Sequence, residues 1–148
     1  MQKIIYIAEA MEAFGAEIGK QFSGGEIIFL KGELGAGKTT LVRGVLRGLG
    51  HSDKVKSPTY TIVEMYELAQ FTVYHFDLYR LNDPMELEDM GIRDYCNAKA
   101  VCLFEWPERG QGIMNEHDLF IEIDHLDEGR QVNLSSHSDR GTRLLKAL

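Results

Sequence analysis

Residues 32–39, with the sequence GELGAGKT, have the residue types and the spacing of a phosphate-binding loop. Glycines let such a loop adopt positive φ angles and turn its backbone N–H groups toward an anion. Lys38 can neutralise the β- and γ-phosphate oxygens, and the hydroxyl of Thr39 can ligate Mg²⁺. The segment therefore predicts that a nucleoside triphosphate binds with Mg²⁺, in contact with the run Gly35, Ala36, Gly37, Lys38, Thr39 and Thr40.

Two acidic residues stand at the ends of apolar stretches that we interpret as strands, Glu105 after residues 100–104 and Asp77 after residues 73–76. A triphosphate site needs an acid that holds Mg²⁺, directly or through water, close to the glycine-rich loop. We predict that Glu105 holds the cation, because its strand is the most apolar one and is expected beside the strand that precedes the loop. Asp77 is predicted to orient or deprotonate the attacking water or to share the metal ion, and an exchange of the two roles stays open. Lys38, Asp77 and Glu105 are therefore the predicted catalytic residues.

Motifs that the sequence lacks narrow the choice of nucleotide and of reaction. The guanine-reading motif Asn-Lys-x-Asp is missing, because residues 97–100 (NAKA) do not supply its acid, and this favours adenine. The arginines are dispersed, whereas small kinases gather them into a lid over the phosphates. An ATPase is thus favoured over a small-molecule kinase, and a module that binds nucleotide without hydrolysing it stays open as a third alternative. Thr59 is either a residue that senses the γ-phosphate or part of a simple proline-containing turn.

The elements that must position these residues alternate between strand and helix patterns. An apolar run at 27–30, within a strand predicted over 26–31, precedes the loop, and apolar residues at helical spacing follow it over 40–49. The continuous apolar run 100–104 is typical of a strand buried on both faces. Residues 60–66 and 71–77 predict an antiparallel hairpin. The remaining predicted strands cover 3–7, 119–123 and 132–135, and the remaining predicted helices and turns cover 8–21, 84–90, 92–97 and 144–148.

Taken together, residues 1–148 predict one α/β domain with the P-loop NTPase fold, in which helices flank a mixed, mostly parallel sheet with an antiparallel hairpin. The chain carries a formal net charge of −7 and no run rich in lysine or arginine. This argues against a main surface that binds nucleic acid, because such binding needs clustered positive charge. The sequence shows no signal-peptide core and no apolar stretch long enough for a bilayer, so we expect a cytoplasmic protein without membrane contact.

Several short segments occur together in the order found in one known family. They are GELGAGKTT at 32–40, KSPTY at 56–60, HFDLYR at 75–80, MGI at 90–92 and EWP at 105–107. This set resembles the TsaE (YjeE) family, bacterial P-loop ATPases of tRNA threonylcarbamoyladenosine (t6A) biosynthesis. The resemblance extends over roughly residues 5–130 and is more specific than the loop motif alone.

The resemblance implies a compact α/β domain that binds ATP or ADP with Mg²⁺ and hydrolyses ATP slowly by itself. It also implies the proteins TsaB and TsaD as partners, whose complex transfers a threonylcarbamoyl group to tRNA. Contact with tRNA is then only indirect, through that complex, which fits the acidic composition.

Matching positions imply roles for individual residues. Lys38 and Thr39 form the loop pair, Asp77 and Glu105 are the acids, and Trp106 is a neighbour of the site. Two further positions are implied to lie near the nucleotide: Met11, where the family tends to have threonine near the adenine, and Arg130.

Overall fold

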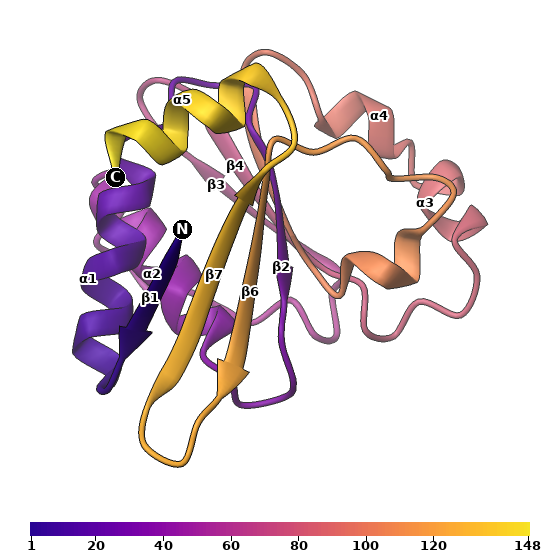
Figure 1. The fold of residues 1–148 in the computed structure, drawn as a ribbon. Coiled ribbons are helices and arrows are strands. Elements are labelled where there is room, and N and C mark those ends of the chain that lie inside the picture. Colours follow the sequence, from indigo (N-terminus) through magenta and orange to yellow (C-terminus); the bar gives the residue numbers. More distant parts are fainter.

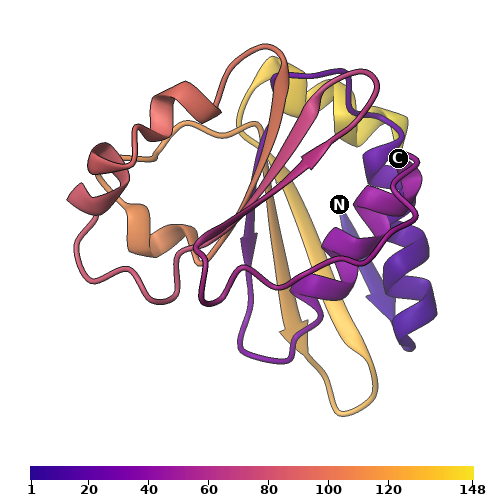
Figure 2. The same cartoon turned by 180° about the vertical axis from the view of Figure 1, so that it is seen from behind.

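The computed structural model describes residues 1–148, and its centre is a seven-stranded sheet with the strand order β1-β7-β6-β2-β5-β4-β3 (Figures 1 and 2). The strands are β1 (Gln2–Ile5), β2 (Ile27–Lys31), β3 (Val63–Glu67), β4 (Thr72–Asp77), β5 (Ala100–Glu105), β6 (Leu119–His125) and β7 (Arg130–Ser136). The helices are α1 (Ala8–Gly19), α2 (Lys38–Gly48), α3 (Met85–Asp89), α4 (Ile92–Tyr95), the 3₁₀ helix η1 (Pro107–Gly110) and α5 (Asp139–Ala147). None of the helices combines the length and the apolar character that a membrane crossing requires. The predicted α/β class is confirmed.

The four central strands of the sheet run parallel, and antiparallel strands complete both edges. Strands β6, β2, β5 and β4 are parallel neighbours, β3 forms the predicted hairpin with β4, and β7 joins β6 to β1 by antiparallel pairing. Leu30 of β2 is paired with Glu105 of β5, and Glu105 is paired with Asp77 of β4. The strand that ends at Glu105 therefore lies beside the strand that precedes the loop, as predicted, and both acids stand at the edge of the sheet where the loop begins.

The sheet divides the apolar core into two clusters. Helices α1 and α2 cover one face and α3 and α4 cover the other, as Figure 1 shows, with a cluster of 23 buried residues on the first face and one of 9 on the second. Strand β5 contributes Val101 and Leu103 to the larger cluster and Cys102 and Phe104 to the smaller one. Because its side chains alternate between two apolar layers, β5 is apolar at every position before Glu105, and all six of its residues are buried.

Glycines allow α1 and α2 to pack with their backbones in close approach. A Cβ atom on Gly44 would lie 2.0 Å from the carbonyl oxygen of Glu12, and one on Gly15 would lie 2.2 Å from that of Leu41. Real Cβ atoms do not come within 3.0 Å of a backbone atom, so the two helices could not keep this separation with any larger residue. The contact fixes α2, and therefore the glycine-rich loop that precedes it, against α1.

Substitution of Gly44 by alanine is expected to destabilise the fold by about 3 kcal/mol, the upper part of the usual cost of overpacking. The added methyl group must push α1 away, and this cost exceeds the gain of roughly 1 kcal/mol in helix propensity. The free energy of unfolding, measured by urea denaturation, tests this expectation. Glu17→Ala, at an exposed position of α1, is the control and should change stability by less than about 0.5 kcal/mol. Equal stabilities of the two variants would contradict the close helix contact.

Several elements begin at residues other than those predicted, among them α2, β3 and α5. Helix α2 begins at Lys38, two residues earlier than the apolar spacing indicates. Strand β3 begins at Val63 rather than at residue 60, because Ile62 has a φ of 70° and its N–H donates to the carbonyl of Pro58 in a turn. Helix α5 begins at Asp139 rather than at residue 144, because the hydroxyl of Ser138 accepts a hydrogen bond from the backbone N–H of Gly141, the third residue of the helix, at 2.9 Å.

Candidate nucleotide-binding site

The glycine-rich loop, residues 32–37, connects the end of β2 to the first turn of α2. Gly35 and Gly37 have φ angles of 78° and 113°, in the left-handed region that favours glycine. No side chain caps the first turn of α2, so its N–H groups are left for another acceptor. The N-terminus of a helix also carries partial positive charge. The loop therefore has the backbone conformation and the free donors of an anion-binding site.

The side chain of Lys38 is buried beneath the loop. Its ammonium group donates a hydrogen bond to the carbonyl of Gly32 and lies 4.3 Å from the ring centroid of Trp106. Burial lowers the pKa of Lys38, and the charges of Glu105 and Asp77 oppose that shift. The lysine thus stands between the loop and the two predicted acids, in reach of an anion that the loop would hold.

Lys38 and both acids line one cavity of about 290 Å³ at the carboxyl edge of the sheet. Glu105 is 3% exposed and Asp77 is 6% exposed, which is unusual for acidic residues. The cavity is also lined by residues from the loop, from the first turn of α2, from the segment before β3 and from the residue after β5, among them Thr39, Thr59 and Trp106. The structure therefore brings together the loop, the lysine and the acids that the sequence analysis singled out.

Asp77 is tied to the segment that precedes β3. Its Oδ2 accepts a hydrogen bond from the Thr59 hydroxyl at 3.3 Å, and its Oδ1 accepts one from the backbone N–H of Tyr79 at 3.0 Å. The N–H of Asp77 in turn donates to the carbonyl of Ile62 at 2.8 Å. Thr59 thus lies in a turn, as one of its two interpretations proposed, and it also contacts an acid of the cavity.

Glu105 is held by a histidine that the sequence analysis did not single out. The Nε2 atom of His75 lies 2.6 Å from Oε2 of Glu105, and the His75 side chain is fully buried. His75 precedes Asp77 by two positions in β4, so both side chains are on the face of the strand that leads to the cavity. That spacing was the available signal, but it acquires meaning only when β4 is known to lie beside β5.

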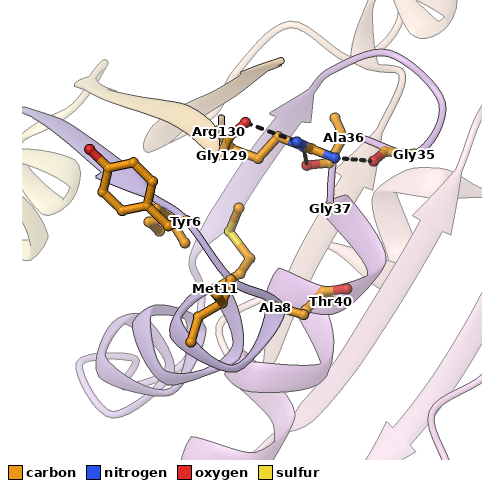
Figure 3. A pocket seen from close by; sticks show the side chains of 11 residues that line it. Tyr6, Ala8, Met11, Gly35, Ala36, Gly37, Thr40, Gly129 and Arg130 are labelled. Carbon is orange, nitrogen blue, oxygen red and sulfur yellow. Dashed lines mark hydrogen bonds between the residues drawn. The ribbon is translucent and has the colours of Figure 1, made fainter. Parts of the chain in front are cut away.

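A second cavity, of about 240 Å³, lies on the other side of the loop, between the start of α1 and the start of β7 (Figure 3). Met11 and Thr40 line it, and Figure 3 shows Arg130 reaching from β7 toward the loop. The guanidinium of Arg130 donates to the carbonyls of Ala36 at 3.1 Å and Gly35 at 3.4 Å. Met11 and Arg130 thus adjoin the same loop from opposite walls of this cavity, and Arg130 contacts the loop backbone itself.

The larger of these two cavities, which Lys38, Asp77 and Glu105 line, has residues that fit a small, hard cation. The hydroxyl of Thr39 and the carboxylates of Asp77 and Glu105 supply oxygen atoms, which Mg²⁺ prefers as ligands. One carboxylate oxygen of Glu105, Oε1, makes no hydrogen bond to the protein. The structure contains no cluster of three or more histidine, cysteine or acidic side chains arranged as a complete metal site. A cation that keeps several waters and binds substrate phosphates does not need such a cluster.

Trp106, the only tryptophan of the chain, is expected to report nucleotide binding. Its indole ring packs against the Lys38 ammonium, which must turn from the Gly32 carbonyl toward the phosphates when they bind. Tryptophan emission should therefore change in a saturable way when ATP and Mg²⁺ are added. The Trp106→Phe variant is the control and should show no such signal. Unchanged emission at a nucleotide concentration that saturates binding by calorimetry would contradict this motion of Lys38.

The comparisons with known proteins agree on one family. The family model described as threonylcarbamoyl adenosine biosynthesis protein TsaE matches residues 6–132. The tRNA threonylcarbamoyladenosine biosynthesis protein TsaE of Haemophilus influenzae is 54% identical over 121 residues, 82% of this chain and 77% of that protein. The Bacillus subtilis protein of the same name is 36% identical over 125 residues, 84% of this chain and 78% of that protein. A crystal structure of YdiB from Bacillus subtilis superposes with a TM-score of 0.82 at 26% identity, over 99% of this chain and 91% of that chain.

Proposed function

The chain belongs to the family of threonylcarbamoyl adenosine biosynthesis proteins TsaE, and from this premise we propose that it binds ATP with Mg²⁺ and hydrolyses ATP slowly. Its hydrolysis would support the turnover of a complex of TsaB and TsaD that modifies tRNA. In this proposal the chain contacts tRNA only through those partners. Its net charge of −7 is in keeping with a protein that binds other proteins rather than nucleic acid.

The observation that carries the proposal is the convergence of three kinds of group in one cavity. An anion-binding loop, the buried Lys38 ammonium and the buried carboxylates of Asp77 and Glu105 all line it. Two buried acids beside one lysine leave an excess of negative charge away from water, which is costly without a further cation. A triphosphate with its divalent cation balances both the free N–H groups of the loop and the excess carboxylate.

Each protein group has a definite part in the proposed reaction. The loop N–H groups and Lys38 bind the phosphate oxygens, and Lys38 stabilises the charge that develops on them during hydrolysis. Glu105 offers its free oxygen to the cation, and Asp77 accepts the proton of the attacking water or orients that water. Bound Mg²⁺ would supply neutralisation of the phosphate charge. Thr59, through its contact with Asp77, is placed to respond to the γ-phosphate.

The positions of the arginines are consistent with slow hydrolysis in the absence of a partner. None of the residues that line the larger cavity is an arginine. The guanidinium groups of Arg80 and Arg109 stack on Tyr60 and Tyr79, at 4.1 and 5.5 Å from the ring centroids. An arginine that reaches the transferred phosphate accelerates hydrolysis by several orders of magnitude. Its absence from the cavity is consistent with an ATPase that needs a partner.

Adenine is the base that we propose for the second cavity. The side chain of Met11 and the apolar residues at the end of β1 form its wall on one side, and Arg130 and the loop backbone close the other side (Figure 3). A planar base can pack against such a wall while the phosphates lie on the loop. This cavity and the larger one flank the same glycines, so one nucleotide can occupy both.

Phosphate release from ATP, measured with and without purified TsaB and TsaD, tests the proposed function. We expect slow, Mg²⁺-dependent release from the chain alone and faster release, with continued formation of modified tRNA, when both partners and tRNA are present. GTP in place of ATP should give weaker binding. Transfer of the phosphate to a nucleoside or a sugar would instead identify a kinase. The absence of phosphate release in the complete mixture would overturn the proposal.

A further inference from the structure

His75 and Glu105 form a buried polar pair below the larger cavity. His75 is 0% exposed and Glu105 is 3% exposed, and the two residues are 30 positions apart in the sequence. Their strands, β4 and β5, are parallel neighbours, and this places the His75 ring within 2.6 Å of the carboxylate. The pairing of the two strands thus brings the two residues together, and one of them, Glu105, is an acid of the site.

Packing alone does not account for a histidine at this position. Other residues of the same face of β4 and β5, such as Val73 and Leu103, belong to the apolar core. The Nδ1 atom of His75 is buried and has no hydrogen-bond partner. Leaving a buried polar atom without a partner costs roughly 1–3 kcal/mol, and an apolar side chain of similar size would avoid that cost. The contact with Glu105 is the one polar interaction of the ring that offsets it.

The geometry shows what the contact does to Glu105. The donor on His75 engages Oε2, whereas Oε1 has no hydrogen bond to the protein. The proton on His75 is therefore best placed on Nε2, the tautomer that donates to the carboxylate. Because His75 holds Oε2, the carboxylate of Glu105 cannot rotate freely about its Cγ–Cδ bond. Oε1 is then the oxygen that is left to face the cavity.

Lys38 is the competing partner for Glu105. Among the charged groups that raise the pKa of Lys38, Glu105 has the largest effect, followed by Asp77. A Glu105 carboxylate that was free to rotate would pair with the ammonium group, which belongs to the one cationic side chain that lines the same cavity. Such an ion pair would remove the acid from a divalent cation and the lysine from the phosphates at once.

We propose that His75 is a positioning residue: its Nε2–H holds Oε2 of Glu105, so that Oε1 faces the divalent cation of the nucleotide and Glu105 does not pair with Lys38. The inference rests on the proposed function, because it assigns how that same site keeps its cation ligand oriented. His75 itself touches neither the nucleotide nor the reacting atoms.

A matched pair of amide substitutions tests this role. In His75→Gln the amide nitrogen lies about where Nε2 of histidine lies and can still donate to Glu105, whereas the shorter His75→Asn side chain cannot reach it. Both variants are polar and neutral, so their effects on folding should be similar, and urea denaturation checks this. The measured quantity is the Mg²⁺ concentration for half-maximal ATP binding, determined by calorimetry at fixed ATP, together with ATP binding in EDTA.

His75→Asn is expected to raise the half-maximal Mg²⁺ concentration by about tenfold or more, the usual effect of removing the partner of a metal ligand. His75→Gln should remain within about threefold of the unmodified protein, and ATP binding in EDTA should be the same for all three. Equal Mg²⁺ requirements of the two variants, whether normal or raised, would overturn the positioning role. The binding readout needs no turnover, so absence of hydrolysis in the unmodified protein would contradict the proposed function without deciding this inference.

Discussion

The Lys38→Ala variant is expected to hydrolyse ATP at least about 100-fold more slowly than the unmodified protein. The ammonium group is buried between the loop and two acids, and it is the one lysine that lines the larger cavity. Removing a preorganised charge of this kind from a water-poor site costs roughly 10²–10³ in rate. The loss should also weaken ATP binding, because Asp77 and Glu105 then repel the phosphates without compensation. Phosphate release under saturating ATP and calorimetric binding measure the two effects separately.

Lys31 offers a matched control for Lys38. It is the last residue of β2, directly before the loop, and it forms only a loose surface contact with Glu122, at 3.9 Å with both side chains well exposed. Such surface pairs contribute little to stability. Lys31→Ala should therefore leave hydrolysis within about twofold of normal. A Lys38→Ala variant that hydrolyses ATP as fast as the Lys31→Ala variant would refute the assignment of the loop as the phosphate site.

The parts of the molecule that were predictable from the sequence are those set by local pattern. The apolar run of β5 indicated burial on both faces, and the structure shows its residues entering both core clusters. The two acids were singled out because each follows a stretch with the pattern of a strand, and the parallel pairing of β4 and β5 brings both to one edge of the sheet. In each case a short stretch of sequence contained the whole signal.

The parts that were missed depend on contacts between distant segments or on local strain. Residues 60–62 are of types that favour strands. Hydrogen bonds of Ile62 with Pro58 and Asp77 hold it at a positive φ, so β3 begins only after it. The close approach of α1 and α2 required glycines of both helices to be aligned, which neither helix reveals alone. His75 was missed for the same reason, because its meaning comes from Glu105 on the neighbouring strand.

The roles of the two acids, which sequence reasoning left interchangeable, are separable by a pair of isosteric substitutions. Both oxygens of Asp77 already accept hydrogen bonds, from Thr59 and Tyr79, whereas Glu105 retains one free oxygen. Glu105→Gln should therefore raise the Mg²⁺ concentration needed for half-maximal hydrolysis by about tenfold or more. Asp77→Asn should lower the maximal rate by about 100-fold, the usual contribution of a general base, with little change in the Mg²⁺ requirement.

An exposed acid distinguishes these effects from a general change of charge. Glu108 also acts electrostatically on Lys38, but it is exposed in η1 and does not line the larger cavity. Glu108→Gln removes the same unit of charge and should change neither the rate nor the Mg²⁺ requirement by more than about threefold. If the results for Asp77→Asn and Glu105→Gln are the reverse of those expected, Asp77 is the cation ligand and the free oxygen of Glu105 faces the attacking water. If neither substitution differs from Glu108→Gln, the two buried carboxylates serve the fold rather than hydrolysis.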